Sequence, residues 1–449
     1  MSTASTGLAR RAANTVRVAV AVPGERRAPY RPARRLAAVR DARVRELVRY
    51  AAEHVPFYRD HFAASGLDPA GFRSAEDLER LPLVDKETVR EAPERFRSLA
   101  PEAHDAVELE TSGSTGVPVQ IAHDRRSVLL NMAWGERERV VVARVVGKGL
   151  RAVTLSVGFG QTSPGAHVRA LYRGATLVPG QRRVRLDLTE PFERVVEVVN
   201  ELRPDVIRSC GSFLEQFFRR LLSSGTPLHR PRAVVYAMDA MSPAGRRLIE
   251  DEAGVPVLSS YNATESLKIG FLCEARAALH LHSDLCHVRI ADAAGRTLPP
   301  GEVGEVVLSN LVNRATVLLN YRLGDLAAAV DGPPCPCGRS LPGLTLPQGR
   351  VRNVLSLPGG GFVNEGAVWI VSERFPDVVA LQVAQLAPLR FEARIVTAGP
   401  AAHDRVAPLV VDELRALLGE GAEIVPVATE ALEAGPRGKT SHVVPLAAP

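Results

Sequence analysis

Apolar positions in the middle of the chain follow two alternating periods. Short apolar runs, each the length of one buried strand, occur at 152–156, 175–178, 205–208, 232–237 and 255–258. Longer stretches with helical spacing of apolar residues separate them, near 124–142, 190–202, 211–224 and 243–253. Strands that alternate with helices are typical of a parallel sheet covered by helices, so this pattern predicts an α/β fold.

The pattern changes on both sides of this region. Residues 33–64 have helical periodicity, which Pro56 interrupts. Between 286 and 330 the apolar positions alternate as in hairpins, and Pro and Gly then cluster between 332 and 361, which predicts a domain boundary. Beyond the boundary, a small α+β domain is predicted from strands near 378–384, 390–397 and 422–427 and a helix at 404–418.

Three parts follow from these elements. Residues 33–349 form a large domain and residues 350–449 a small one, and 449 residues are enough for both cores. Residues 1–32 form a leader, which we expect to lack stable structure because it is rich in Arg.

Charge and hydropathy narrow the class of protein. The net charge is +6, but residues 1–45 alone contain eleven Arg and only two acidic residues. This basic arm lacks the motifs that read nucleic acid, so no nucleic-acid partner is predicted. No run of 18 apolar residues exists, and Arg17 interrupts the apolar stretch 16–22, so we expect neither a membrane span nor a signal peptide. These features predict a cytoplasmic protein, and its five cysteines argue against a disulfide framework.

The loop Thr111–Pro118 is the first candidate for chemistry. Its sequence, Thr-Ser-Gly-Ser-Thr-Gly-Val-Pro, brings four hydroxyl groups and two glycines together after the strand-like run 106–110. Glycine allows positive φ, so successive backbone N–H groups can turn towards one anion. A flexible linker has a similar composition, but an apolar run follows at once, and no Lys-Ser/Thr pair closes the loop as in a Walker A motif. We therefore predict phosphate binding.

Four shorter motifs follow in order: Tyr261-Asn-Ala-Thr-Glu265, Tyr321-Arg-Leu-Gly-Asp325, Gly349-Arg350 and Gly438-Lys439. Each has an ordinary structural explanation: Tyr261 can be a core residue, Asp325 can cap a turn and Lys439 can be a solvated tail residue. The chain contains only four lysines, at 86, 148, 268 and 439, so a lysine at a motif position is informative.

Taken together and in this order, the motifs resemble those of the adenylate-forming superfamily, which includes acyl-coenzyme A synthetases and peptide-synthetase adenylation domains. Within it the chain is most similar to the phenylacetate–coenzyme A ligase branch. That similarity rests on His54-Val-Pro-Phe-Tyr-Arg59, Leu81-Pro-Leu-Val-Asp-Lys86 and Cys335-Pro-Cys-Gly-Arg339. The resemblance covers roughly residues 35–449.

The resemblance implies a fold and an activity. The fold would be a large N-terminal AMP-binding domain, with parallel sheets, helices and a small β-barrel-like part, and a small mobile C-terminal α+β domain. The enzyme would be an AMP-forming acid–thiol ligase that uses ATP and Mg²⁺ to activate a small carboxylic acid as its adenylate. The acyl group would then pass to a thiol, with coenzyme A favoured, and a homodimer is left open.

The resemblance also assigns roles to nucleotide-binding residues. The phosphates would be held by the loop residues Thr111, Ser112, Gly113, Ser114, Thr115 and Gly116. The catalytic residues would be Thr264 at the α-phosphate, Glu265 as the Mg²⁺ ligand and Lys439 as the bridge between the attacking carboxylate and the phosphate. Adenine and ribose would be bound by Asp239, Ala240, Tyr261, Asn262, Asp325 and Arg350. The acid would contact Phe159, Gly211 and Tyr236.

The cysteines form a second candidate site. The resemblance, in which some members carry a structural metal, suggests a zinc site made of Cys273, His280, Cys335 and Cys337. His282, Cys286 and His287 are alternative ligands, and a site without metal, in which the cysteines are small buried apolar residues, is equally open. Cys210 is expected to be an unrelated core residue.

Three departures from the branch leave the acceptor of the acyl group open. Asn262 stands where the branch has Gly, and the segment 359–365 also differs. Arg352 and Asn353 follow the Gly349-Arg350 motif, where the branch has an acidic pair. A carrier protein or an amine is therefore an alternative acceptor to coenzyme A. A non-catalytic nucleotide-binding protein is a third reading, which the joint presence of Glu265, Asp325 and Lys439 disfavours.

Overall fold

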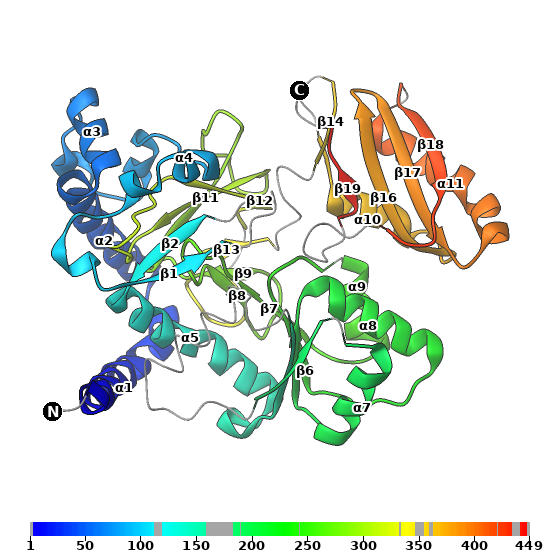
Figure 1. The fold of residues 1–449 in the computed structure, drawn as a ribbon, viewed down its shortest axis with the longest axis horizontal. Helices are drawn as coiled ribbons and strands as arrows, with labels where there is room; N and C mark the ends of the chain where they lie inside the picture. The colour runs from blue at the N-terminus through cyan, green and yellow to red at the C-terminus, as the bar shows by residue number, and fades with distance from the viewer. Residues whose placement is uncertain are drawn as a thin grey trace. The chain divides into compact units, whose positions relative to one another are not determined.

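The computed structural model describes residues 3–111, 119–158, 183–188, 190–241, 243–331, 334–345, 354–358, 362–419, 421–432 and 441–446 (Figure 1). The chain divides into two compact units. The large unit comprises residues 1–239, 249–323 and 327–346. The small unit comprises residues 240–248, 324–326 and 347–449. Its longest segment begins at residue 347, and it also takes in two short segments from the middle of the chain.

An eight-stranded sheet forms the centre of the large unit, in the order β13-β9-β8-β7-β6-β5-β3-β4. Its strands are β3 (Thr154–Gly158), β4 (Arg183–Asp187), β5 (Val206–Ser209), β6 (Ala233–Tyr236), β7 (Val257–Tyr261), β8 (Gly270–Leu272), β9 (Leu279–Leu281) and β13 (Gly343–Leu344). Strands β4, β3, β5, β6 and β7 are parallel, and β8, β9 and β13 extend the sheet in antiparallel fashion. The predicted alternation is confirmed for β3, β5, β6 and β7, whereas β4 was not predicted and the predicted strand 175–178 lies outside the described residues.

The helices between these strands match their predicted ranges closely. They are α5 (Arg125–Val146), α7 (Phe192–Leu202) and α8 (Gly211–Ser224), followed by the shorter α9 (Pro243–Arg247), which continues as a π-helical turn over Leu248–Glu252. On one face of the sheet, Val141 and Val146 of α5 pack against Val206, Val235 and Leu258 of the three central strands. Burial of these aliphatic side chains fixes α5 across the sheet.

A second layer of the large unit comes from its N-terminal half and its hairpins. It contains α2 (Ala33–His54), α3 (Pro56–Ser65), α4 (Lys86–Glu91), β1 (Ala106–Glu110), β2 (Gln120–Asp124), β10 (Cys286–Ala291), β11 (Val303–Asn310) and β12 (Tyr321–Ala328). Strands β1 and β2 form a hairpin, and β10-β11-β12 form a three-stranded sheet, the small β part that the sequence predicts. Val48 of α2, Tyr58 of α3, Ile121 of β2 and Tyr321 of β12 belong to one buried cluster.

The leader differs from its prediction. Residues Thr3–Arg27 form a helix, α1, which packs along α5. Glu25 pairs with Arg137 of α5 at 2.5 Å, and Arg26 pairs with Glu136 at 2.8 Å. The prediction of a leader without stable structure was wrong because it used charge composition alone. The ion-pair partners of Glu25 and Arg26 lie more than 100 positions further along the chain, where composition cannot show them.

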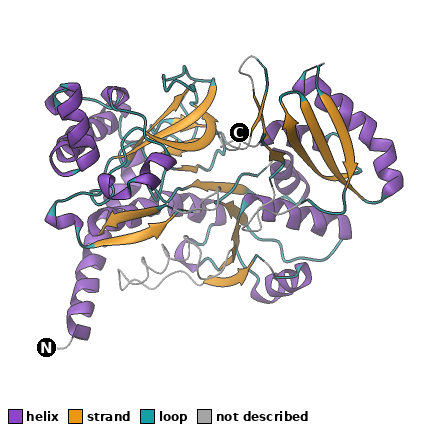
Figure 2. Cartoon of the chain, turned by 45° about the horizontal axis from the view of Figure 1, so that its top comes forward, coloured by secondary structure: helices purple, strands orange, loops and turns teal. Residues whose placement is uncertain are grey.

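The small unit has its own sheet and core (Figure 2). The strand order is β18-β17-β16-β19, with β16 (Val378–Ala387), β17 (Arg390–Thr397), β18 (Glu423–Ala428) and β19 (Val443–Val444). A separate pair is formed by β14 (Val354–Ser356) and β15 (Phe362–Asn364). The helices α10 (Glu365–Glu373) and α11 (Pro400–Leu418) join one buried cluster with β16, β17 and β18. This part has the predicted α+β composition.

Within the described residues, none of the helices is both long and apolar enough to cross a lipid bilayer.

Candidate active site

The motif Tyr261–Glu265 begins at the carboxyl end of β7, the strand at which the parallel part of the sheet meets the antiparallel part. Ligands of open α/β sheets bind at this edge. The chain turns sharply after the strand, because the backbone N–H groups of Ser266 and Leu267 both donate to the carbonyl of Ala263, at 3.2 and 2.7 Å. The turn reverses the chain into β8, which pairs antiparallel with β7.

Glu265 is held by two residues of the three-stranded sheet. Its side chain is largely buried, with the residue 8% exposed. The Tyr321 hydroxyl at the start of β12 donates to Glu265 Oε1 at 3.1 Å, and Asn310 Nδ2 at the end of β11 donates to the Glu265 carbonyl at 3.0 Å. The carboxylate therefore has a defined orientation, which a metal-binding or catalytic carboxylate needs.

Thr264 connects this motif to the β1–β2 hairpin. Its hydroxyl donates to the Glu110 carbonyl at 3.4 Å, and His123 Nε2 lies 2.7 Å from the Thr264 carbonyl. Burial lowers the pKa of His123 to about 4, so the ring is neutral at pH 7 and donates from Nε2. Two segments about 150 residues apart in the sequence thus meet at the end of β7.

The same hairpin carries the hydroxyl-rich loop. Thr111 closes the base of the loop, because its backbone N–H donates to the Val119 carbonyl and its Oγ1 accepts from the Val119 N–H, both at 2.9 Å. Ser112, Gly113, Ser114, Thr115 and Gly116 lie outside the described residues. The described base of the loop, Thr111, is therefore joined through Glu110 to Thr264, next to Glu265.

The neighbouring strands β5 and β6 bring Gly211 and Asp239 together. The Asp239 carboxylate accepts a hydrogen bond from the Gly211 N–H, the first residue of α8. A carboxylate at a helix N-terminus compensates the positive end of the helix dipole. Tyr236, at the end of β6, is 4% exposed. The sequence predicted that Gly211 contacts the acid and that Asp239 contacts adenine. In the structure these two residues are hydrogen-bonded to each other.

The remaining predicted residues are located as follows. Asp325 and Ala240 belong to the small unit, and Asp325 is a half-buried residue of β12. Tyr261 is 8% exposed at the end of β7, and Asn262 follows it, with its amide near the Ser260 carbonyl at 3.3 Å. Phe159, Arg350 and Lys439 lie outside the described residues, so their predicted roles stay predictions.

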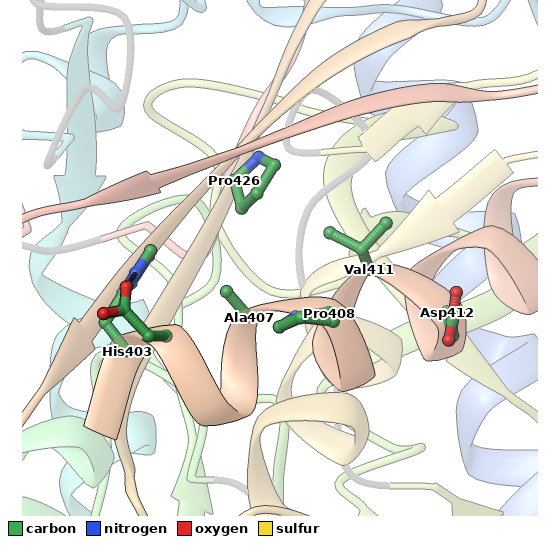
Figure 3. Close-up of a pocket in the computed structure, with 7 residues that line it drawn as sticks. His403, Ala407, Pro408, Val411, Asp412 and Pro426 are labelled. Atoms are coloured by element: carbon green, nitrogen blue, oxygen red, sulfur yellow. Dashed lines mark ion pairs between the residues drawn. The ribbon is translucent and has the colours of Figure 1, made fainter. Parts of the chain in front are cut away.

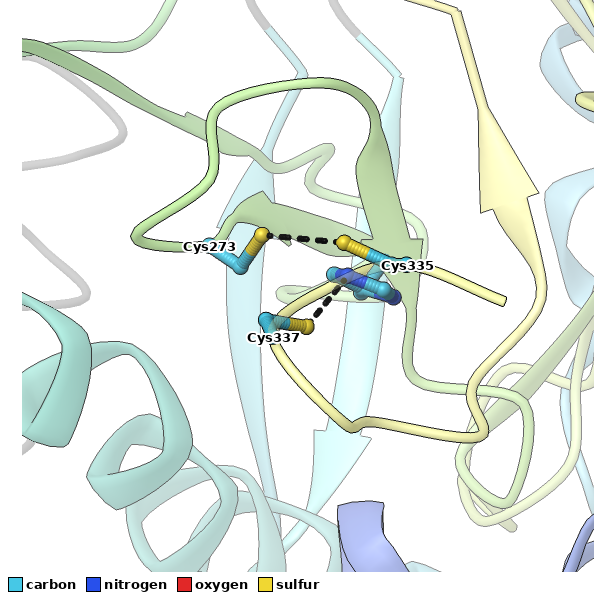
Figure 4. Close-up of side chains that lie close together, drawn as sticks. Cys273, Cys335 and Cys337 are labelled. Carbon is cyan, nitrogen blue, oxygen red and sulfur yellow. Dashed lines mark hydrogen bonds between the residues drawn. The ribbon is translucent and has the colours of Figure 1, made fainter. Parts of the chain in front are cut away.

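The proposed zinc ligands Cys273, His280, Cys335 and Cys337 form a compact group, with one ligand atom of each within 4.8 Å of the others (Figure 4). Cys273 follows β8, His280 lies on β9, and the two other cysteines lie in the segment that leads to β13. Antiparallel pairing of these three strands brings the four residues together.

The distances in this group suit a tetrahedral metal ion. Cys273 Sγ lies 3.6 Å from Cys335 Sγ, and Cys337 Sγ lies 3.3 Å from His280 Nε2. Tetrahedral zinc with bonds of about 2.3 Å to sulfur separates two sulfur ligands by roughly 3.8 Å. His280 Nδ1 donates to the Leu341 carbonyl at 3.3 Å, which leaves the Nε2 lone pair for a metal.

The alternative ligands have other surroundings. His282 Nε2 lies 3.7 Å from Glu138 Oε1, and Cys286 Sγ lies 3.8 Å from the His282 carbonyl. Burial lowers the pKa of His287 to about 4 and raises the pKa of Cys286 to about 12. None of these three residues belongs to the ligand group found among the described residues, and Cys210 is buried apart from it, as predicted.

The sequence missed a cluster of charged side chains beside the motif. Lys268, three residues beyond Glu265, pairs with Glu138 of α5 at 3.0 Å. The scarcity of lysine in the chain was the one signal that could have marked Lys268. Glu138 on α5 has no sequence motif around it, so only the packing of α5 on the sheet reveals it.

A depression on the small unit is a weaker candidate (Figure 3). It has a volume of about 380 Å³ and lies along α11, where it is lined mainly by apolar side chains together with His403, Asp404 and Asp412. None of the predicted site residues lines it. Its exposed carboxylates make it a poor site for phosphate or a carboxylic acid.

Comparisons with known proteins agree with this arrangement. A family model described as AMP-binding enzyme matches residues 27–313. The phenylacetate–coenzyme A ligase of Thermus thermophilus is 29% identical over 343 residues, 73% of this chain and 73% of the relative. That of Pseudomonas putida is 26% identical over 317 residues, 66% and 67% of the two chains.

A solved structure extends the likeness to the fold. The crystal structure of 2-hydroxyisobutyryl-CoA ligase in the postadenylation state, in complex with 2-HIB-AMP, has a TM-score of 0.70 to this chain. The match covers 93% of this chain and 91% of that chain at 19% identity. This likeness confirms the predicted α/β fold class.

Proposed function

Because the chain belongs to the family of AMP-binding enzymes, we propose that it is an AMP-forming acid–thiol ligase. It activates a small carboxylic acid with ATP and passes the acyl group to coenzyme A. The observation that carries the proposal is the orientation of Glu265, held at the end of β7 by Tyr321 and adjoining, through Thr264, the base of the hydroxyl-rich loop. The phenylacetate–coenzyme A ligase relatives support the reaction class.

The first half-reaction joins the acid to AMP. A carboxylate oxygen of the acid attacks the α-phosphorus, the bond to the β-phosphate oxygen breaks, and pyrophosphate leaves. Both reactants and the leaving group are anionic, so the site must neutralise charge in the transition state. Glu265 would bind the Mg²⁺ of MgATP, the hydroxyl of Thr264 would donate to the α-phosphate, and Lys439 would bridge the two reacting groups.

Binding of the nucleotide uses the remaining predicted residues. The loop from Thr111 to Gly116 would donate hydrogen bonds to the β- and γ-phosphates. Tyr261 and Asn262, with Asp239 and Ala240, would border adenine. Asp325 would accept hydrogen bonds from the ribose hydroxyls, with Arg350 beside it.

The second half-reaction transfers the acyl group. The thiolate of coenzyme A attacks the carbonyl carbon of the adenylate, a thioester forms, and AMP leaves with the electron pair of the broken C–O bond. The acid would contact Tyr236, Gly211 and Phe159 near the ends of β6, β5 and β3. The small unit carries Lys439, so its movement would separate the two half-reactions.

We further propose a structural zinc ion bound by Cys273, His280, Cys335 and Cys337. The observed sulfur and nitrogen distances support this set, as does the hydrogen bond that orients the His280 ring. Burial raises the pKa of Cys273 to about 12, so a cation is needed to hold it as a thiolate at pH 7. The ion would fasten the 334–340 segment to β8 and β9.

An ATP–pyrophosphate exchange assay tests the adenylation step. The native chain should exchange label only when a suitable acid is present, and Lys439→Ala should lower the exchange rate by at least about 100-fold while ATP still binds. Lys148→Ala is the matched control. It also removes a lysine, but Lys148 pairs with Asp205 at the amino end of β5, whereas the candidate site lies at the carboxyl ends of the parallel strands. Exchange that is unaffected by Lys439→Ala would contradict the proposed mechanism.

The acceptor is tested separately. Once an acid supports exchange, addition of coenzyme A should release AMP and yield an acyl-coenzyme A of the expected mass. If AMP is released with a carrier protein or an amine but not with coenzyme A, the acceptor is that carrier protein or amine and not coenzyme A.

A further inference from the structure

Three charged side chains outside the adenylation motifs gather on the face of the sheet that α5 covers. They are Glu138 of α5, Lys268 after β7 and Arg208 of β5. Glu138 Oε1 accepts from Lys268 Nζ at 3.0 Å, and Glu138 Oε2 accepts from Ser260 Oγ at 3.2 Å. Burial alone would raise the pKa of Glu138, but its interactions, above all with Lys268, outweigh burial and lower the pKa to about 2, so Glu138 is ionised.

Strand register places Arg208 on this face. Val206 of β5 and Leu258 of β7 pack with α5 in one buried cluster. Side chains of a strand alternate between faces, so Arg208 and Ser260, each two residues further on, face α5 as well. Both strands run in the same direction, so these two residues lie towards the carboxyl edge of the sheet, where the Tyr261–Glu265 motif begins.

The cluster has one more positive charge than negative. No hydrogen bond or ion pair of Arg208 is found among the described residues, and the charged group that acts on its pKa is Glu138. That carboxylate is already paired with Lys268. His282 does not change the balance, because burial lowers its pKa and its ring is neutral at pH 7. Arg137 is neutralised separately by Asp284 and Glu25.

A guanidinium that lacks a partner among the described residues is unfavourable in this position unless an anion reaches it. Burial lowers the pKa of Arg208, which reflects the cost of removing its charge from water. The residue is half-buried, so part of its surface is open to a ligand from solution. Guanidinium groups bind carboxylates with two parallel hydrogen bonds, which makes a carboxylate the best-fitting ligand.

We propose that Arg208 binds a second carboxylate on the acid, so that the enzyme activates dicarboxylic acids in preference to monocarboxylic acids. This inference rests on the proposed function. One carboxylate of the acid reacts beside Thr264 and Glu265, and the other lies at Arg208. Lys268 holds Glu138 and thereby prevents that carboxylate from neutralising Arg208.

Matched pairs of acids test the inference in the ATP–pyrophosphate exchange assay with the full-length chain. The pairs are 4-carboxyphenylacetate with phenylacetate, and adipate with hexanoate. The acid 4-(aminomethyl)phenylacetate, whose benzylic amine is protonated at pH 7, tests the opposite charge. The native enzyme should favour the diacid of at least one pair by tenfold or more in kcat/KM. Arg208→Met should lower this preference by about 10- to 100-fold, and Arg208→Lys should retain part of it.

The ratio of the kcat/KM values for two acids, measured on one preparation, does not depend on how much of a variant is folded. Arg151→Met, which removes an exposed guanidinium, is the control and should leave the ratio unchanged. A native preference for the monoacids or for 4-(aminomethyl)phenylacetate, or a ratio that Arg208→Met does not change, would overturn the inference while the acid-activating function stands. Failure of every acid to support exchange would instead count against the proposed function itself.

Discussion

Asp284→Asn should strongly destabilise the large unit, because it leaves a buried guanidinium without its main counter-ion. The Arg137 side chain has no exposed surface, and its Nη1 and Nη2 donate to the two Asp284 carboxylate oxygens, both at 2.7 Å. The Asp284 side chain is 7% exposed. Burial would raise the pKa of Asp284, but Arg137 overrides this and lowers it, so the pair is charged at pH 7.

The expected size of the effect follows from the two carboxylates around Arg137. Removing one partner of a buried ion pair costs about 3–5 kcal/mol in the free energy of unfolding. Glu25 remains at 2.5 Å, so we expect the lower end, about 3 kcal/mol, for Asp284→Asn. Glu25 is more exposed, at 20%, and Glu25→Gln should cost only about 1 kcal/mol. Asp284→Asn should affect activity only indirectly, through the position of α5, which carries both Arg137 and its neighbour Glu138.

Urea unfolding followed by tryptophan fluorescence measures both values. The chain has two tryptophans, and Trp134 donates to Asp284 Oδ2 at 3.2 Å, so a Trp369→Phe background reports the large unit alone. The midpoint should fall for both variants at an unchanged slope, and about three times further for Asp284→Asn. Equal shifts, or a loss below about 1 kcal/mol for Asp284→Asn, would refute the reasoning.

Three further predictions concern the site. The fully buried His123 has its pKa lowered to about 4, against about 6.5 in the unfolded chain, so the unfolded state binds more protons between these values. The free energy of unfolding should therefore fall by at most roughly 3 kcal/mol as pH falls from about 6.5 to 4. In urea titrations at several pH values, His123→Gln should flatten this dependence of stability on pH. An unchanged dependence in the variant would assign the effect to other titratable groups. Glu265→Gln should lower pyrophosphate exchange by about 100-fold and raise the Mg²⁺ concentration needed for half-maximal rate, whereas a lower rate with an unchanged Mg²⁺ requirement would argue against a metal ligand. Cys337→Ser should lose bound zinc, measured by elemental analysis after dialysis, while Cys210→Ser retains it; equal metal content in both variants and the native chain would exclude the four-residue site.

The sequence by itself determined the elements that local patterns encode. The alternation of strands and helices appears where it was predicted, because buried strands and amphipathic helices differ in the period of their apolar positions. The motif Tyr261–Glu265 was identifiable because its residues are contiguous. The cysteine and histidine set was identified only through a family resemblance, and the spacing of Cys335 and Cys337 argued weakly against it.

Only the tertiary structure decided which distant residues meet. The hydrogen bond from Tyr321 to Glu265, the bond from Thr264 to Glu110 and the pairing of Glu138 with Lys268 each join segments separated by 56 to 154 positions. Such contacts depend on strand order and register, which a one-dimensional pattern does not contain. The same reason explains the helix at Thr3–Arg27: its composition shows an excess of positive charge, but its ion-pair partners Glu136 and Arg137 and the α5 surface on which it packs are supplied by the fold.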